Sequence, residues 1–96
     1  MSFRIHPEAV RDIREIASGY AKVSVRVHDQ FWNALDDALG SIEASPERHH
    51  FDPSGYRRAN LFRFPYHVLY QHTAQATLVL VVRHHRRDPA FGLERS

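Results

Sequence analysis

The sequence predicts an α+β fold in which a short N-terminal strand precedes an antiparallel pair of helices and a three-stranded antiparallel meander, in the order β-α-α-β-β-β. Three observations lead to this prediction. Apolar residues recur at helical spacing in the first half of the chain, and aromatic and β-branched residues form three short runs in the second half. The connections between these segments are short. With 96 residues, the chain is expected to form one domain, residues 1–96, around one core.

The N-terminal segment predicts a strand that leads directly into a helix. Phe3 and Ile5 alternate with polar residues, which is the period of a half-buried strand. Pro7 is a favoured first helical residue, and apolar side chains then recur every three or four positions up to Tyr20. We assign the charged residues of this amphipathic helix to its solvent-exposed face: Glu8, Arg11, Asp12, Arg14 and Glu15.

A second, longer helix is predicted after a short polar break. Gly19 and the residues around Ser24 interrupt the apolar pattern, which resumes at Val27 and continues to Ile42. This helix is expected to end before Pro46. Because so few residues connect the two helices, we expect them to lie antiparallel as a hairpin.

The second half of the chain contains three runs with the composition of strands, Tyr56–Phe62, Tyr66–His72 and Thr77–Val82. Short polar breaks separate them, which favours an antiparallel meander. The third run is apolar on both faces, so we expect a central strand that packs on the helices and is partly covered on its other side. The N-terminal strand can flank it.

Composition excludes several classes of protein. The chain has no cysteine, so disulfides and thiolate metal sites are excluded. No apolar run has the length of a signal peptide core or a membrane span, so we expect a soluble, cytoplasmic protein. The adjacent pairs His49–His50 and His84–His85 point in divergent directions in extended structure and no carboxylate recurs at a ligand spacing. We therefore expect no metal and no cofactor.

Charge is distributed unevenly along the chain. Residues 1–47 contain five basic and eight acidic side chains, a net charge of −3, whereas residues 48–96 contain eight basic and three acidic side chains, a net charge of +5. Twelve of the thirteen basic residues are arginine, whose planar guanidinium group suits bidentate contacts with phosphate or carboxylate. An anionic partner is therefore expected to bind the C-terminal half.

The candidate site residues are the arginines and histidines on or beside the three predicted strands. They are Arg57, Arg58, Arg63, His67, His84, His85, Arg86 and Arg87. Successive side chains of a strand point to opposite faces, so only one member of each adjacent pair can face a shared concave surface. The sequence leaves open which member of each pair does so.

Three segments resemble the RelE/ParE superfamily of bacterial toxins. They are the opening Ile5–Ile13 (IHPEAVRDI), the strand Arg63–Tyr70 (RFPYHVLY) and the tail His84–Pro89 (HHRRDP). The resemblance covers nearly the whole chain in the same order of elements. It implies a growth-arresting toxin of a type II toxin-antitoxin pair, held inactive by an antitoxin whose C-terminal segment wraps around it.

The motifs are closer to the ParE branch, which keeps the Phe-Pro-Tyr strand and the Arg-Arg-Asp-Pro tail. That branch is linked to inhibition of DNA gyrase, so the resemblance implies gyrase as the protein target. The residues expected to bind this target, or a phosphate, are Arg57, Arg58, Arg63, Arg86, Arg87 and Phe91.

Two alternatives remain open. Members of the RelE branch cleave mRNA on the ribosome, and His67, His84 and His85 lie where that branch carries its catalytic basic residues. These histidines would then transfer protons while the arginines neutralise the phosphate. Phe91, however, stands where several of these ribonucleases have a tyrosine, and its ring cannot transfer a proton. The second alternative is a non-toxic relic that keeps the fold and still binds an antitoxin.

Overall fold

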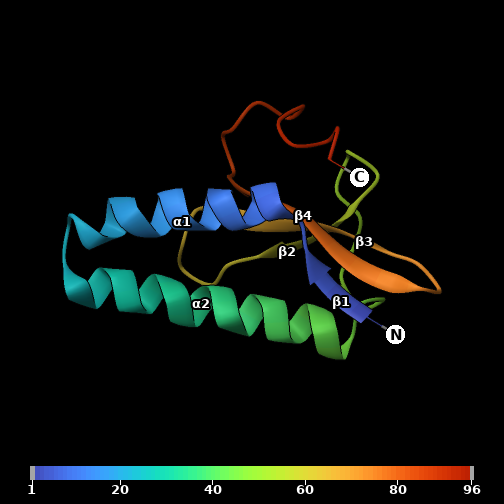
Figure 1. The fold of residues 1–96 in the computed structure, drawn as a ribbon, viewed down its shortest axis with the longest axis horizontal. Coiled ribbons are helices and arrows are strands. Elements are labelled where there is room, and N and C mark those ends of the chain that lie inside the picture. Colours follow the sequence, from blue (N-terminus) through green and yellow to red (C-terminus); the bar gives the residue numbers. More distant parts are fainter. Residues whose placement is uncertain (1, 96) are drawn as a thin grey trace.

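The elements occur in the predicted order in the computed structural model, which describes residues 2–95. Its helices and strands are β1 (Ser2–Ile5), α1 (Pro7–Ala21), α2 (Val25–Ala44), β2 (Arg57–Asn60), β3 (Tyr66–His72) and β4 (Ala76–His84) (Figure 1). The α+β class and the helical hairpin are thus confirmed. Within the described residues, no helix has both the length and the apolar composition that a membrane crossing requires.

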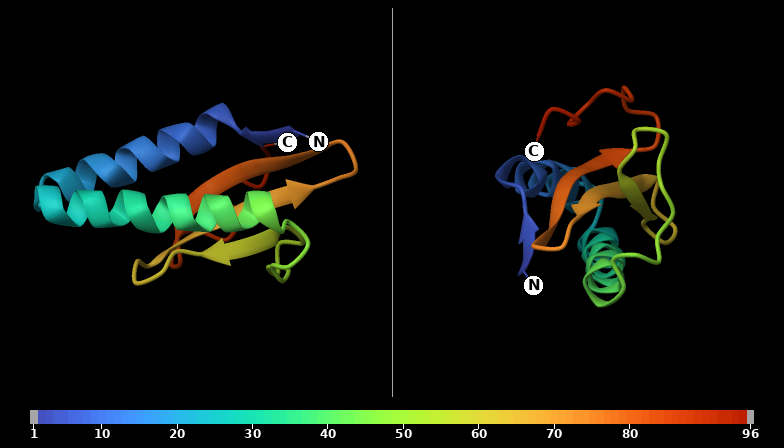
Figure 2. Two further views of the ribbon diagram at one scale, coloured as in Figure 1. Left: turned by 90° about the horizontal axis from the view of Figure 1, so that it is seen from below. Right: turned by 90° about the vertical axis from the view of Figure 1, so that its right-hand side faces the viewer.

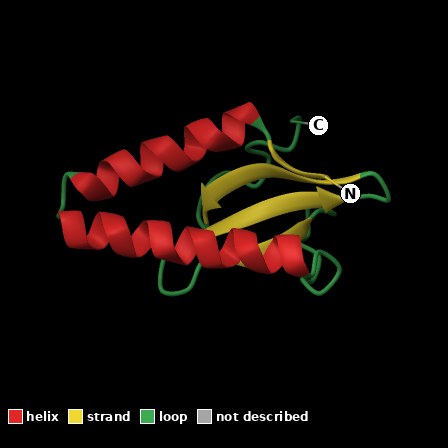
Figure 3. Cartoon of the chain, turned by 60° about the horizontal axis from the view of Figure 1, so that its bottom comes forward, coloured by secondary structure: helices red, strands yellow, loops and turns green. Residues whose placement is uncertain are grey.

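Both helices begin at residues whose side chains cap the first turn. The Nδ1 atom of His6 accepts a hydrogen bond from the backbone N–H of Glu8 at 3.0 Å, just before Pro7 opens α1. The hydroxyl of Ser24 accepts one from the N–H of Val27 at 3.1 Å at the start of α2. Such caps pair amide groups that a helix leaves free. The short connection then folds α2 back antiparallel to α1 (Figure 3).

The sheet differs from the prediction in one respect. Its strand order is β1-β4-β3-β2, and β1 pairs parallel to β4, whereas β2, β3 and β4 form the expected antiparallel meander. β1 therefore flanks the central strand β4, as expected, but the prediction of a purely antiparallel sheet was wrong, because the sheet is mixed and four-stranded. The physical reason is that the helical hairpin, β2 and β3 together form the long crossover that a parallel pair needs.

The molecule has three layers. The two helices cover one face of the sheet, and the C-terminal segment, residues 85–95, covers part of the other face (Figure 2). Phe31, Leu35 and Tyr70 are completely buried between the helices and the sheet. On the opposite face, Leu69 and Leu80 belong to a second buried cluster that Phe91 and Leu93 of the C-terminal segment cover. The central strand β4 is therefore buried on both faces, as expected.

A β-bulge in β4 determines which side chains share a face. Leu69 pairs with Val81 and Tyr70 pairs with Val79, so Leu80 is an extra residue in β4. Such a bulge interrupts the regular alternation of side chains. As a result both Leu80 and Val81 contact the C-terminal segment, and Arg83, two residues beyond Val81, also points away from the helices.

Candidate functional site

A polar cleft lies on the sheet face that the helices do not cover. It has a volume of about 450 Å³, and its walls come from the loop before β2, the outward faces of β2, β3 and β4, and the C-terminal segment. Its charged and imidazole side chains are Asp52, Arg58, His67, Arg83, His85 and Arg87. Guanidinium and imidazole groups from separate strands therefore converge on one side of the sheet.

The strand register decides which member of each adjacent pair faces the cleft. Arg58 pairs with Leu69, on the outward face, whereas Arg57 pairs with Tyr70, which points toward the helices. The Nη1 atom of Arg57 instead donates hydrogen bonds to the backbone carbonyls of Glu47 (3.1 Å) and His49 (2.7 Å). Arg57 therefore fixes the loop before β2 and lies outside the cleft.

Hydrogen bonds fix the tautomers of the two histidines in the cleft. The Nε of Arg83 donates to Nε2 of His67 at 3.0 Å, and because a guanidinium group can only donate, neutral His67 must carry its proton on Nδ1. That Nδ1 lies 3.0 Å from Nδ1 of His85, and Nη2 of Arg58 lies 3.2 Å from the same atom. His85 therefore accepts at Nδ1 and carries its own proton on Nε2.

His67 is neutral at pH 7. Its side chain is buried in a stack with His85, with ring centroids 5.2 Å apart and an interplanar angle of 7°. Burial, followed by the positive charges of Arg58 and Arg83, lowers the pKa of His67 to about 4. Burial and Arg58 also lower the pKa of His85.

Two of the three arginines of the cleft, Arg58 and Arg83, are bound by other groups of the protein. The carboxylate of buried Asp52 accepts a hydrogen bond from Nη1 of Arg58 at 3.0 Å and lies 3.9 Å from Nη2 of Arg83. Burial alone would raise the pKa of Asp52, but hydrogen bonds from Ser54 and Arg58 outweigh it and lower that pKa. Arg83 also donates to the carbonyls of Pro89 (2.8 Å) and Phe91 (3.0 Å). It thereby attaches the C-terminal segment to the sheet.

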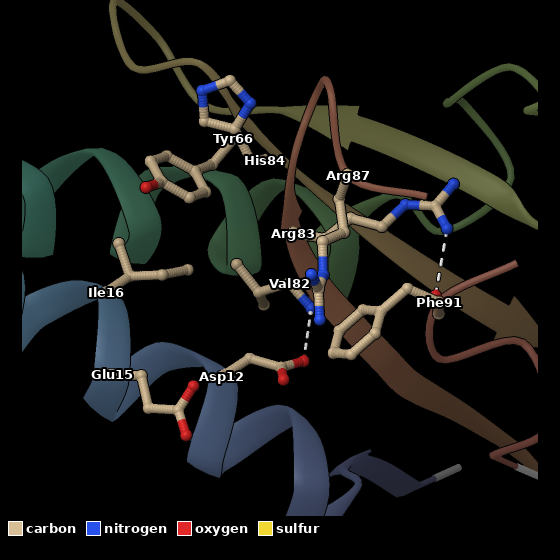
Figure 4. A pocket seen from close by; sticks show the side chains of 9 residues that line it. All are labelled: Asp12, Glu15, Ile16, Tyr66, Val82, Arg83, His84, Arg87 and Phe91. Carbon is tan, nitrogen blue, oxygen red and sulfur yellow. Dashed lines mark hydrogen bonds between the residues drawn. The ribbon is translucent and has the colours of Figure 1, made fainter. Parts of the chain in front are cut away.

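His84 lies in a second hollow of about 300 Å³ between α1, the end of β4 and the C-terminal segment. Figure 4 shows His84 beside Tyr66, at a distance from the ring of Phe91. The Nδ1 atom of His84 accepts a hydrogen bond from the backbone N–H of Arg86 at 3.0 Å. Hence His84 and His85 face different hollows, and neutral His84 carries its proton on Nε2.

Of the remaining predicted site residues, Arg87 reaches the cleft, whereas Arg63 and Arg86 lie outside it. Arg63 lies in the turn between β2 and β3, next to Phe62, with a left-handed backbone (φ 65°). Arg86 is exposed beyond β4. Arg87 borders both hollows, and its guanidinium carbon lies 4.1 Å from the centroid of the Phe91 ring.

A buried ion pair that the sequence analysis missed supports the C-terminal segment. Nη1 and Nη2 of Arg95 lie 2.6 and 3.2 Å from the carboxylate oxygens of Asp12, which is buried although we expected it on the exposed face of α1. Asp12 also accepts a hydrogen bond from the backbone N–H of Val82 at 3.1 Å (Figure 4). Arg95 donates a hydrogen bond to the carbonyl of Leu80 at 3.1 Å. Beyond the end of β1, on the edge of β4 that β1 leaves unpaired, the ion pair thus satisfies backbone N–H and C=O groups of β4. The sequence indicated the burial of Asp12 only by its position three residues after the core residue Ala9, on the same face of α1.

Comparison with known proteins identifies the family. A model of the ParE toxin of type II toxin-antitoxin systems, parDE, matches residues 3–89. The chain belongs to the ParE toxin family. Among solved structures, it is similar to a chain from the chromosomal ParDE toxin-antitoxin system of P. aeruginosa, with a TM-score of 0.64 and 16% sequence identity over 88% of this chain and 95% of that one. Among curated proteins, none matches this chain significantly.

In this ParE-family chain, the candidate catalytic histidines share one property. The acceptor nitrogen of His67, of His84 and of His85 already receives a hydrogen bond from within the protein. The other ring nitrogen of each of these three histidines carries the proton when the imidazole is neutral. The cleft can therefore donate hydrogen bonds from His85, but it presents no free basic nitrogen to a substrate.

Proposed function

We propose that this chain is the growth-arresting toxin of a type II toxin-antitoxin pair and that it acts by binding and inhibiting DNA gyrase. Membership of the ParE toxin family supports the toxin assignment. Gyrase as the target is our inference from the resemblance of the sequence to the ParE branch. This function requires a protein-binding surface and no acid-base chemistry.

The observation that carries the proposal is the absence of a free base among the candidate catalytic histidines. Cleavage of RNA by general acid-base catalysis needs side chains that can exchange protons with the substrate. His67 is only 1% exposed and its acceptor nitrogen is bound to Arg83. The acceptor nitrogen of His85 contacts Arg58 and His67. The geometry therefore favours binding over cleavage.

The test is to incubate the purified chain with gyrase and a relaxed plasmid. We expect loss of supercoiling and accumulation of linear plasmid trapped as a cleavage complex. His84→Ala and His85→Ala should inhibit gyrase as the unchanged chain does, because neither imidazole performs chemistry in this proposal. Gyrase that supercoils normally at an excess of folded protein would refute it.

An antitoxin partner is part of the same proposal. The C-terminal half carries the excess of arginine, and the side chains of Arg63, Arg86 and Arg87 are exposed. An acidic, amphipathic segment of the antitoxin can pair with these groups. We expect the chain to co-purify with a small acidic protein encoded beside it, and high salt should weaken the complex.

A second candidate function, ribosome-dependent cleavage of mRNA, is favoured by one observation, the convergence of two imidazoles and three guanidinium groups in one cleft. The test is to add the chain to translating ribosomes and map the ends of the message. His85→Ala should then abolish cleavage, whereas His50→Ala, an exposed histidine outside the cleft, should not. Intact messages would remove this candidate. Normal growth after induction without the antitoxin would instead support a non-toxic relic.

A further inference from the structure

Two exposed phenylalanines lie at the two ends of β2, each beside an arginine. The Phe51 side chain is 62% exposed, and the guanidinium carbon of Arg57 lies 4.3 Å from its ring centroid. Phe62 is 73% exposed, and the guanidinium carbon of Arg63 lies 5.0 Å from its ring centroid. A single exposed apolar side chain is common on protein surfaces, but here each of the two rings lies beside a guanidinium group.

The fold holds both rings along one edge of the sheet. β2 is the outermost strand, Phe51 forms a β-bridge with Arg57 at its start, and Phe62 lies two residues beyond its last residue, Asn60. From Arg57 to Phe62 an extended chain spans at most about 18 Å. Phe62 follows the buried residue Leu61 and precedes Arg63, whose φ of 65° is unusual for a side chain of this size. The turn therefore presents Phe62 to solvent from a constrained position.

This edge is also strongly basic. Residues 48–63 contain four arginines and one acidic residue, Asp52. That aspartate pairs with Arg58. Within residues 2–95, no carboxylate lies within 4.0 Å of the guanidinium groups of Arg48, Arg57 or Arg63. The β2 edge thus combines aromatic faces with cations that have no acidic partner.

We propose that the β2 edge binds a single strand of nucleic acid, whose bases stack on Phe51 and Phe62 and whose phosphates contact Arg57 and Arg63. Aromatic rings beside arginines are the usual platform for unpaired bases, since every base has a face that can stack. A duplex offers no free base face, so single strands are preferred. This function goes beyond gyrase inhibition and involves no cleavage. DNA and RNA share the required chemistry.

The test is fluorescence anisotropy of the purified chain with labelled 12-nucleotide oligothymidylate, oligouridylate and a DNA duplex. We expect both single strands to bind more tightly than the duplex, and their relative affinity distinguishes DNA from RNA as the preferred ligand. Phe51→Ala and Phe62→Ala should each weaken binding about 5-fold or more, because stacking on one ring has about this effect. Arg63→Gln should reduce the slope of log affinity against log salt by about 0.7.

Two matched variants control for general effects of exposed residues. Val25, 74% exposed at the start of α2, is replaced by alanine, and the neighbouring exposed Arg26 is replaced by glutamine. Neither change should weaken binding as the changes on the β2 edge do. All variants are first checked for an unchanged melting temperature.

Three results would overturn the proposal. The first is no binding of either single strand at low salt by a chain that still inhibits gyrase, which would leave the gyrase proposal intact. The second is binding that depends on salt but is the same in both phenylalanine variants. The third is a Phe62→Ala variant that loses affinity only for the antitoxin, which would assign the edge to a protein partner.

Discussion

Neutral, buried His67 should make the protein sensitive to mild acid. The pKa of this imidazole is about 4 in the folded chain, compared with 6.5 for an ordinary histidine. Protonation is therefore easier in the unfolded state, and the stabilisation is fully present above pH 6.5 and is lost as the pH falls toward 4. Over the whole interval the loss amounts to about 3 kcal/mol, of which about 2 kcal/mol is lost by pH 5.

The structure gives the physical reason for this loss. A protonated His67 can no longer accept the hydrogen bond from Nε of Arg83, and its charge lies beside the guanidinium groups of Arg83 and Arg58. Asp52 is the nearby carboxylate that partly offsets this repulsion, and its lowered pKa keeps it ionised in this pH interval. A loss of 2 kcal/mol is large for a small domain.

The assay is urea unfolding at pH 7.5 and at pH 5.0, with unfolding monitored by circular dichroism. His67→Gln keeps an acceptor for Arg83 and cannot titrate, so its free energy of unfolding should fall by about 2 kcal/mol less between the two pH values than that of the unchanged chain. His50→Gln, at an exposed position, controls for the loss of a histidine. If His67→Gln and the unchanged chain lose the same free energy, the reasoning about His67 is wrong.

Three further predictions concern stability and are measured by urea unfolding. A methyl group on Gly92, where φ is 84°, would lie 2.3 Å from a Val81 methyl carbon, so Gly92→Ala should cost about 3 kcal/mol. Gly55→Ala, with φ 92° but open space around it, should cost only about 1 kcal/mol, and equal losses would refute the clash. Asp12→Ala should cost about 3–5 kcal/mol because Arg95 stays buried without its partner, and the double variant Asp12→Leu, Arg95→Met should be more stable than this single one. Tyr70→Phe should cost about 1 kcal/mol, since its hydroxyl donates to the Pro46 carbonyl at 2.6 Å; no change would show that the bond contributes nothing.

Local patterns predicted the elements because each helix and strand depends on nearby residues. The helical spacing up to Tyr20 and the polar break near Ser24 determine the hairpin, and α1 ends only one residue later, at Ala21. That β1 flanks β4 was expected, but the parallel direction of this pair was not predictable in this way. The pair joins residues more than seventy positions apart, and neither strand carries a local signal for a parallel neighbour.

The cleft was predicted only in part for similar reasons. Its residue types and strands were identified, but the choice between Arg57 and Arg58 depends on the register with β3, and the direction of Arg83 depends on the bulge at Leu80. Arg83 itself was not singled out by the sequence, although it contacts His67 and the C-terminal segment. The apolar run of β4 contains no sequence signal that marks the position of this β-bulge.

The parallel position of β1 has a consequence for how the molecule assembles. The helical hairpin and the meander can form from neighbouring segments, whereas β1 must wait for β4, and closing so long a loop is slow. In that interval one side of β4 lacks its neighbour and can accept the same strand from another molecule. Refolding from urea at high protein concentration should therefore yield dimers that have exchanged their N-terminal strands, and dilution should suppress them.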